Sequence, residues 1–267
     1  MVDNAVVSHN SVNELYYLEE VDSTNTWAKA NLDKFGPVGA VYTTSQTAGR
    51  GRRGHTWINA SGQALYYTVV LKTELAQPES LPLFASMAVA DALEQRYGIQ
   101  CQIKWPNDLY LDHRKVAGIL CESVIPPGAG GATRVLVGVG VNVNSRVNDF
   151  PGELRPLVTT VREHIRAPLS LQDLLPRFVQ AISDQVARLG NNRAAILADW
   201  QRYDYLAGRE VVCTVGMDVR KGVAAGLNEE GRYRLRDPEG CVHEVIGGQL
   251  RLRAASLPED STGPGRG

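Results

Sequence analysis

Short apolar segments alternate with helical patterns along the first three quarters of the chain. Segments rich in β-branched and aromatic residues that end at Gly, Pro, Asn or Asp predict strands. These strands cover residues 15–18, 38–44, 64–71, 101–105, 109–111, 116–124 and 135–143. Apolar residues three or four positions apart predict helices, which cover residues 22–32, 81–97, 171–189 and 194–203. The pattern indicates one mixed or antiparallel sheet with helices packed on it.

After Gly208 the chain changes to short strands separated by turn residues. The predicted strands are 210–215, 219–227, 233–236 and 242–246, which is typical of a small barrel. The tail from residue 255 is rich in Pro, Gly, Ser and Asp and has almost no apolar residues, so we expect it to be disordered. These boundaries predict a large domain over 12–206, a small domain over 207–254 and a disordered tail over 255–267.

The composition excludes several classes of protein. Of the 267 residues, 43% are hydrophobic, which is enough for a sizeable core, and the net charge of −1 gives no support to a nucleic-acid or membrane-surface protein. No apolar run reaches the ~20 residues of a membrane span, and the N-terminus lacks the features of a signal peptide. The four cysteines are widely spaced, with no pattern of a disulfide framework or zinc site. We therefore expect a cytoplasmic protein with neither DNA nor membrane as a partner.

A glycine- and arginine-rich segment, Gly49 to Gly54, is the first candidate for chemistry. Its sequence, GRGRRG, matches the G-x-G-x-x-G fingerprint of dinucleotide-binding folds. The fingerprint requires a helix to begin at its end, whereas this segment leads into the predicted strand 64–71, which argues against it. What remains is three guanidinium groups, from Arg50, Arg52 and Arg53, that suit phosphate or carboxylate oxygens. A solvated surface loop or an arginine-rich nucleic-acid patch is the alternative.

A second candidate segment is KWPNDLYLDHRKVAGIL, residues 104–120. Its alternation of turn-forming polar residues with strand-forming apolar ones predicts one hairpin that carries Lys104, Asn107, Asp108 and Lys115. Taken singly, an Asn-Asp pair is an ordinary turn and a lysine is an ordinary surface residue.

Together, the two segments resemble the biotin–protein ligases, also called holocarboxylase synthetases. In that family a G-R-G-R-x-G loop, a K-W-P-N-D segment and an R-K-x-x-G-I-L-x-E strand follow one another, as do Gly49 to Gly54, Lys104 to Asp108 and Arg114 to Glu122 here. Further matching positions are Ser23-Thr24-Asn25, Gln46, Trp57 and the segment 138–144. The resemblance spans about residues 15 to 250. Only about fourteen residues precede the first predicted strand, so the chain resembles the short members without a DNA-binding helix-turn-helix.

The resemblance implies the fold and the reaction. The fold is α+β, with a class II synthetase-like catalytic domain, a mixed sheet backed by helices, and a C-terminal SH3-like barrel. The reaction is activation of biotin by ATP to biotinyl-5′-AMP, followed by transfer of the biotinyl group to a lysine of a biotin carboxyl carrier protein domain. Magnesium is implied because triphosphates enter such sites as metal complexes. The oligomeric state is not readable from the sequence.

The resemblance also implies roles for the site residues. Lys115 bridges the biotin carboxylate and the α-phosphate, and Arg50, Gly51 and Arg52 form a loop that closes over biotin and its adenylate. The biotin ring contacts come from Ser23, Thr24, Asn25 and Gln46. Trp57 is an aromatic wall for the nucleotide, Asn142 contacts the nucleotide, and Lys104, Asn107 and Asp108 form a second cationic and metal or acceptor-lysine region. Asp108 is the candidate to orient or deprotonate the incoming lysine.

Several of these residues have ordinary structural alternatives. Ser23 also suits a helix cap, Trp57 also suits a core position, and Asn142 also suits hydrogen bonding at a strand end. The five histidines show no spacing of metal ligands, and we assign no metal-ligating residue.

Two other functions remain as alternatives. A lipoate–protein ligase shares the core but is expected to carry an R-R-x-x-G-G-G-x-V-x-H-D segment, which is absent here. An arginine-rich nucleic-acid-binding module would carry an excess of basic charge, which is also absent.

Overall fold

The structure is a computed structural model that describes residues 14–58, 63–73, 80–125, 133–245 and 249–253. It divides into two compact units, with the boundary between Tyr203 and Asp204. The tail expected from residue 255 lies outside the described residues, as do residues 126–132 between the predicted strands 116–124 and 135–143. Within the described part of the chain, no helix is both long enough and apolar enough to span a membrane.

The first unit is built on a seven-stranded sheet with the order β1-β2-β3-β7-β6-β5-β4. Its strands are β1 Glu14–Tyr17, β2 Val38–Thr43, β3 Leu65–Thr73, β4 Gln102–Lys104, β5 Asp108–Leu111, β6 Arg114–Val124 and β7 Thr133–Val141. Strand β1 pairs with β2 in parallel and every other pair is antiparallel, which confirms the predicted mixed sheet.

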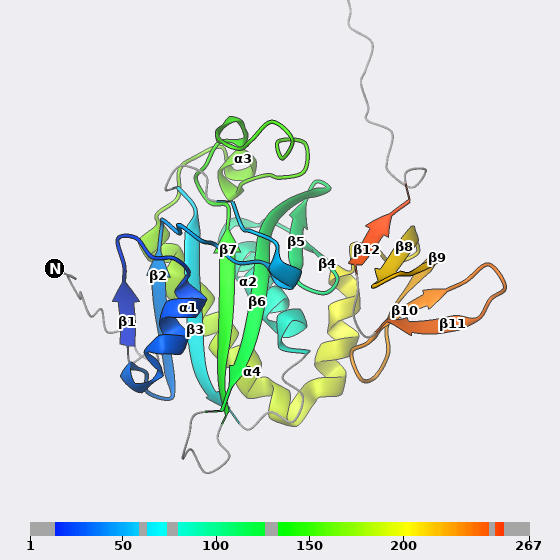
Figure 1. Ribbon diagram of the computed structural model, residues 1–267, viewed down its shortest axis with the longest axis horizontal. Helices are drawn as coiled ribbons and strands as arrows, with labels where there is room; N and C mark the ends of the chain where they lie inside the picture. The colour runs from blue at the N-terminus through cyan, green and yellow to red at the C-terminus, as the bar shows by residue number, and fades with distance from the viewer. Residues whose placement is uncertain (1–13, 59–62, 74–79, 126–132, 246–248, 254–267) are drawn as a thin grey trace, which may run out of the picture. The chain divides into compact units, whose positions relative to one another are not determined.

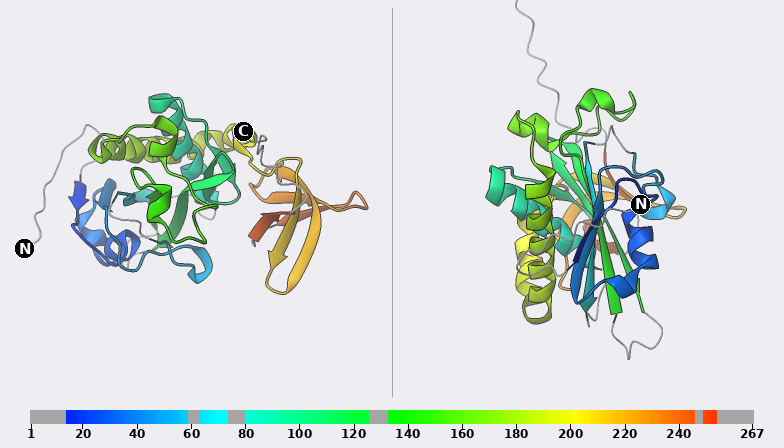
Figure 2. Two further views of the ribbon diagram at one scale, coloured as in Figure 1. Left: turned by 90° about the horizontal axis from the view of Figure 1, so that it is seen from above. Right: turned by 90° about the vertical axis from the view of Figure 1, so that its left-hand side faces the viewer.

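Helices cover both faces of this sheet (Figures 1 and 2). Helices α2 (Leu81–Tyr97) and α4 (Leu171–Trp200) lie against one face, and α1 (Thr24–Ala30) lies against the other. On the α2/α4 side, the ring of Tyr67 on β3 stacks on Phe178 of α4, with centroids 5.9 Å apart. Strand residues alternate between faces, so the side chains next to Tyr67 along β3 point toward α1.

The helical pattern was partly misread from the sequence. The two helices expected over 171–189 and 194–203 are one helix, α4, with a kink at Asn192 (φ −145°), followed by a 3₁₀ turn at Gln201–Tyr203. Gly190-Asn191-Asn192 has low helix propensity and looks like a loop in sequence, yet the helix resumes after it. The helix expected over 22–32 ends at Ala30, and a 3₁₀ turn, Leu32–Lys34, follows. The short helix α3, Val161–Ile165, was not predicted.

The second unit is one antiparallel sheet with the order β11-β10-β9-β8-β12. The strands are β8 Glu210–Val215, β9 Asp218–Leu227, β10 Tyr233–Arg236, β11 Val242–Val245 and β12 Gln249–Leu252, of which β12 was not predicted. Its buried residues include Val211, Cys213, Leu227, Tyr233 and Leu235. Among the described strands, the edge strands β11 and β12 do not pair, so the expectation of a closed SH3-like barrel is not confirmed.

Candidate active site

Two glycines form a flat patch on the α1 face of the large sheet. Gly118 of β6 and Gly140 of β7 are partners in register, and the indole of Trp57 lies directly on them. A Cβ atom added to Gly118 would lie 2.6 Å from this ring, and one added to Gly140 would lie 2.9 Å from it. Any larger residue at either position would therefore displace the tryptophan. Trp57 is thus part of a surface on the sheet, and not a core residue.

Lys115 lies at the edge of this glycine patch. Its Nζ is 5.0 Å from the centroid of the Trp57 ring, a cation–π contact, and 2.7 Å from Oδ1 of Asp108. The backbone of Lys115 is held on both sides: its N–H donates to the carbonyl of Leu157 (2.8 Å), and its carbonyl accepts from the N–H of Thr159 (2.9 Å). The ammonium group is therefore positioned by a rigid strand and two partners.

Asn107 connects the K-W-P-N-D segment to β6. Its side-chain Nδ2 donates to the carbonyl of Ile119 (2.8 Å), and its own carbonyl accepts from the N–H of Ile119 (2.9 Å). Its Oδ1 accepts from the guanidinium of Arg52 (3.3 Å). Burial lowers the pKa of Arg52, and the neighbouring Arg53 lowers it further. Asn107 thus holds both its own hairpin and the glycine- and arginine-rich segment that carries Arg52.

The arginine loop, Gly49 to Trp57, is a short hairpin. The N–H of Trp57 donates to the carbonyl of Gly49 (2.9 Å), Arg50 bridges Thr56, and the N–H of Gly51 donates to the carbonyl of His55 (2.7 Å). The hairpin turns at Arg52–Gly54, where Arg53 and Gly54 both have positive φ. Its two arms present Arg50 and Trp57 toward the sheet.

The N-terminal end of α1 forms a buried polar network with β3. The N–H of Thr24 donates to Oε1 of Gln46 (2.8 Å), and the Thr24 hydroxyl lies 2.9 Å from that of Thr68. Ser23 is the N-cap residue, but its side chain makes no capping hydrogen bond. Ser23, Thr24 and Asn25 are 3–4% exposed. Buried hydroxyl and amide groups at this position suit recognition of a small polar ring.

Asn25 is fixed by hydrogen bonds at both ends of its amide. Its Nδ2 donates to the carbonyl of Leu120 (3.1 Å) and to Oε2 of Glu122 (2.9 Å), and its Oδ1 accepts from the hydroxyl of Thr68 (2.6 Å). A Cβ added to Gly138 would lie 2.1 Å from this Oδ1. Both amide hydrogens are thus used within the protein, so Asn25 holds the network together. Glu122 was not singled out from the sequence, although it ends the R-K-x-x-G-I-L-x-E match.

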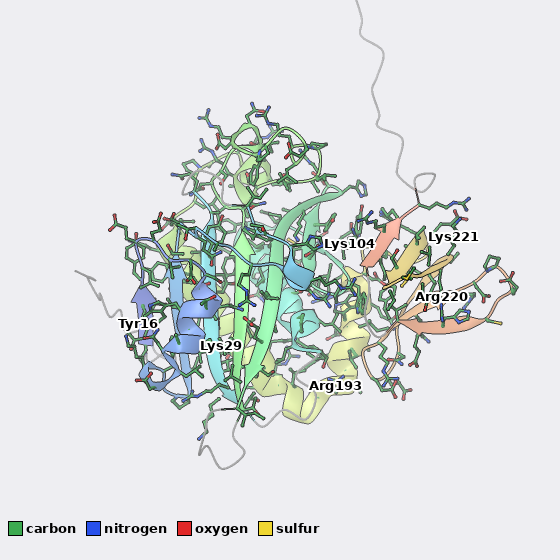
Figure 3. The ribbon with its side chains drawn as sticks, in the orientation of Figure 1. Tyr16, Lys29, Lys104, Arg193, Arg220 and Lys221 are labelled. Atoms are coloured by element: carbon green, nitrogen blue, oxygen red, sulfur yellow. The ribbon has the colours of Figure 1, made fainter. Side chains whose placement is uncertain are left out.

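Two other predicted residues have structural partners. The Nδ2 of Asn142 donates to the carbonyl of Thr159 (3.1 Å), which is the strand-end hydrogen bonding considered as its alternative role. Lys104, labelled in Figure 3, has its Nζ 3.4 Å from the hydroxyl of Tyr110. Among the residues that the structure describes, no three His, Cys, Asp or Glu side chains cluster as a metal site.

The arrangement suits an elongated anionic ligand. Lys115 and Arg50 each bring a positive charge to one face of the sheet, and each is paired with a carboxylate, Asp108 and Glu122. The indole of Trp57, which lies on the glycine patch, adds an apolar, flat surface beside Lys115. Cations that are held in position can stabilise negative charge as it develops in a reaction.

Comparison with known proteins gives one consistent result. Residues 17–142 match the model of the biotin/lipoate A/B protein ligase family. The chain is 30% identical to the bifunctional ligase/repressor BirA of Bacillus subtilis over 245 residues, which cover 89% of this chain and 74% of that protein. It is 33% identical to the biotin–[acetyl-CoA-carboxylase] ligase of Paracoccus denitrificans over 233 residues, 84% of this chain and 94% of that protein.

Solved structures agree. The biotin protein ligase of Aquifex aeolicus, in complex with biotin and ATP, superimposes with a TM-score of 0.77 at 28% identity. The match covers 90% of this chain and 98% of that chain.

Proposed function

This chain belongs to the biotin protein ligase family, and on that premise we propose that it catalyses both steps of biotin attachment. In the first step, a carboxylate oxygen of biotin attacks the α-phosphorus of ATP, the bond to the bridging oxygen of the β-phosphate breaks, and biotinyl-5′-AMP and pyrophosphate form. In the second, the ε-amine of a carrier lysine attacks the acyl carbon, AMP leaves, and the amine loses a proton. Relatives named as biotin ligases, and a similar structure that holds biotin and ATP, support this choice of substrates.

The placement of Lys115 is the observation that carries the proposal. Its ammonium lies beside an aromatic ring and a carboxylate on the face of a rigid sheet. Biotin's carboxylate and the triphosphate repel each other, so a fixed cation between them lowers the barrier to attack. We propose that Lys115 moves from Asp108 to these substrate oxygens when they bind.

Biotin recognition would depend on the network around α1. We propose that Ser23, Thr24 and Gln46 contact the ureido ring, while Asn25 keeps these groups in place because its own amide hydrogens are already used. Arg50, Gly51 and Arg52 would cover biotin and the adenylate as a lid. Such a lid keeps water and stray amines away from the reactive anhydride.

The second step requires a group that accepts a proton near the acyl carbon. Asp108 is exposed on about a quarter of its side chain, close to Lys115, and we propose that it orients or deprotonates the carrier lysine. Lys104 and Asn107, from the same hairpin, would help to seat that lysine. Magnesium would enter with ATP as part of the substrate, held mainly by the phosphates.

The partner would be the biotin carboxyl carrier domain of a carboxylase, in the cytoplasm. The four cysteines, Cys101, Cys121, Cys213 and Cys241, are all free thiols, which suits a reducing compartment. We also expect no sequence-specific operator binding, because a net charge of −1 supplies no excess of positive charge. A sequence-selective gel shift at moderate salt would contradict that expectation.

One assay tests the proposal. Pyrophosphate release is measured with ATP, Mg²⁺ and, separately, biotin, lipoate or octanoate, and we expect release with biotin alone. A carrier domain is then added, with a variant whose acceptor lysine is replaced by arginine as control, and biotinylation is detected with streptavidin. Release with lipoate and not with biotin would favour a lipoate ligase.

A further inference from the structure

Glu122 of β6 joins two parts of the site that are far apart in sequence. Its Oε2 accepts from Nδ2 of Asn25 at the start of α1 (2.9 Å). The same carboxylate pairs with Arg50 of the arginine loop, with Nη1–Oε2 and Nη2–Oε1 distances of 3.3 and 3.4 Å. One side chain thus connects the polar network beneath the predicted biotin ring with the loop above it.

The side of this contact toward α1 is rigid. Asn25 is bonded to β6 and β3 and is pressed against Gly138, so its amide has no room to turn toward the sheet. The Nδ2 of Asn25 points toward β6, where the Glu122 carboxylate is one of its two acceptors. Because Asn25 cannot turn, this hydrogen bond holds the Glu122 carboxylate in a fixed position on the sheet.

The side toward the loop is more open. The side chain of Arg50 is 48% exposed and that of Glu122 is 20% exposed. A guanidinium has five N–H donors in a planar fork, of which this pair uses two. The other donors of Arg50 are left for an anionic ligand while the loop is already held near the sheet.

We propose that Glu122 is a positioning residue for biotin ligation. It holds Arg50, and with it the arginine loop, over the α1 end of the site before any substrate binds. A loop held in this way loses less conformational entropy on binding, which lowers the substrate concentration that is needed. This inference rests on the proposed function, since it assigns Glu122 to the biotin end of that same site.

The substitution Glu122→Gln separates the two contacts. Glutamine keeps an oxygen to accept from Asn25, but it removes the charge that pairs with Arg50. Since an exposed pair of this kind is worth a factor of about two to five, hydrogen exchange of the unliganded loop, residues 49–57, should accelerate by that factor. The KM for biotin should rise by a similar factor while kcat stays within about twofold. Glu122→Ala, which also removes the acceptor of Asn25, should raise the KM by more than Glu122→Gln does.

The matched control is Glu210→Gln, which removes an arginine–carboxylate pair with Arg253 in the second unit. It should change neither the hydrogen exchange of the loop nor the KM for biotin. Loop exchange and KM equal to those of the unmodified chain in Glu122→Gln would overturn the proposal. A loss of kcat alone would also overturn it, since it would place Glu122 in the chemical step. If the unmodified chain releases no pyrophosphate with biotin, the proposed function fails. Hydrogen exchange of residues 49–57 still tests whether Glu122 holds the arginine loop.

Discussion

The Nζ of Lys115 and Oδ1 of Asp108 lie 2.7 Å apart across the β5–β6 hairpin. Both side chains are about one quarter exposed, so the pair is partly shielded from solvent screening. The charge of Lys115, which we propose binds the substrate anions, is thus balanced by Asp108 before the substrates bind. When Lys115 turns to the substrate anions, the carboxylate is freed close to the reacting atoms, which suits a proton acceptor for the second step.

Lys115→Ala should abolish adenylate formation. If the ammonium stabilises charge that develops at the α-phosphate, its loss should cost ~3 kcal/mol or more in transition-state binding, a fall in kcat/KM of at least about a hundredfold. Biotin-dependent pyrophosphate release measures this, and thermal unfolding should show the fold intact. Lys72→Ala, at an exposed position on β3, is the control. Normal release in the Lys115 variant would remove this residue from the mechanism.

Asp108→Asn should affect the two steps differently. Asparagine keeps the size of the side chain but cannot accept the lysine proton at neutral pH. We expect pyrophosphate release to persist, whereas transfer from preformed biotinyl-5′-AMP to the carrier should slow by about 10²-fold or more. Single-turnover transfer is the appropriate measurement. Equal slowing of both steps would indicate that Asp108 acts only by holding Lys115.

Gly118→Ala tests the patch beneath Trp57. The added Cβ would lie 2.6 Å from the indole, so the ring must leave the sheet. We expect a red shift in tryptophan fluorescence and a rise in the KM for ATP or biotin of about tenfold, which is ~1.4 kcal/mol. The free energy of unfolding should change little, because alanine is no worse than glycine in a strand. Gly152→Ala is the matched control, since a Cβ there meets no atom within 4 Å. Unchanged tryptophan fluorescence and KM would contradict the proposal that Trp57 lies on Gly118 and contributes to substrate binding.

Arg52→Gly should loosen the lid without stopping adenylation. Its guanidinium ties the loop to Asn107, and without that tie the reactive anhydride should escape. We expect several-fold more free biotinyl-5′-AMP and biotin spread onto albumin added as a bystander. Arg53→Gly is the control from the same loop, because Arg53 is exposed and its φ of 55° suits glycine. Biotin labelling confined to the carrier would show that Arg52 supports the structure of the loop and does not retain the adenylate.

The sequence predicted most strands because apolar segments and the turn residues between them are local features. The candidate site residues came instead from the resemblance to the biotin–protein ligases. The strands over 116–124 and 135–143 were predicted as short apolar segments bounded by turn residues. The observed β6 includes all of the first, and β7 includes most of the second. The pairing of β7 between β3 and β6 could not be predicted, since it joins segments that are distant in sequence.

The role of Glu122 was hidden for the same reason. Its partners, Asn25 and Arg50, lie 97 and 72 residues away along the chain. The glycines at 118, 138 and 140 also look like ordinary strand positions in sequence. Only the structure shows that Asn25 and Trp57 need the space that these glycines leave.

Tyr233→Phe should destabilise the second unit in a way that depends on pH. The Tyr233 hydroxyl donates to the buried carboxylate of Asp204, with O–O distances of 2.7 and 2.9 Å to its two oxygens. Burial raises the pKa of Asp204 above its ordinary 3.8, and the tyrosine bond opposes that rise. A carboxyl whose folded pKa is raised contributes stability that is present below its unfolded pKa and is lost as pH rises through its folded pKa.

Without the hydroxyl the folded pKa of Asp204 rises further, so the penalty of the variant grows as pH rises through the folded pKa and the carboxylate becomes charged. A hydrogen bond to a charged group contributes ~1.5–3 kcal/mol, and one to a neutral group contributes about 1 kcal/mol. The difference in unfolding free energy between Tyr233→Phe and the unmodified chain should therefore be larger at pH 7 than near pH 4, as measured by urea unfolding of both proteins in parallel. Tyr97→Phe, on α2, is the control. A penalty that stays constant or grows as pH falls would show that Tyr233 stabilises the unit by packing alone.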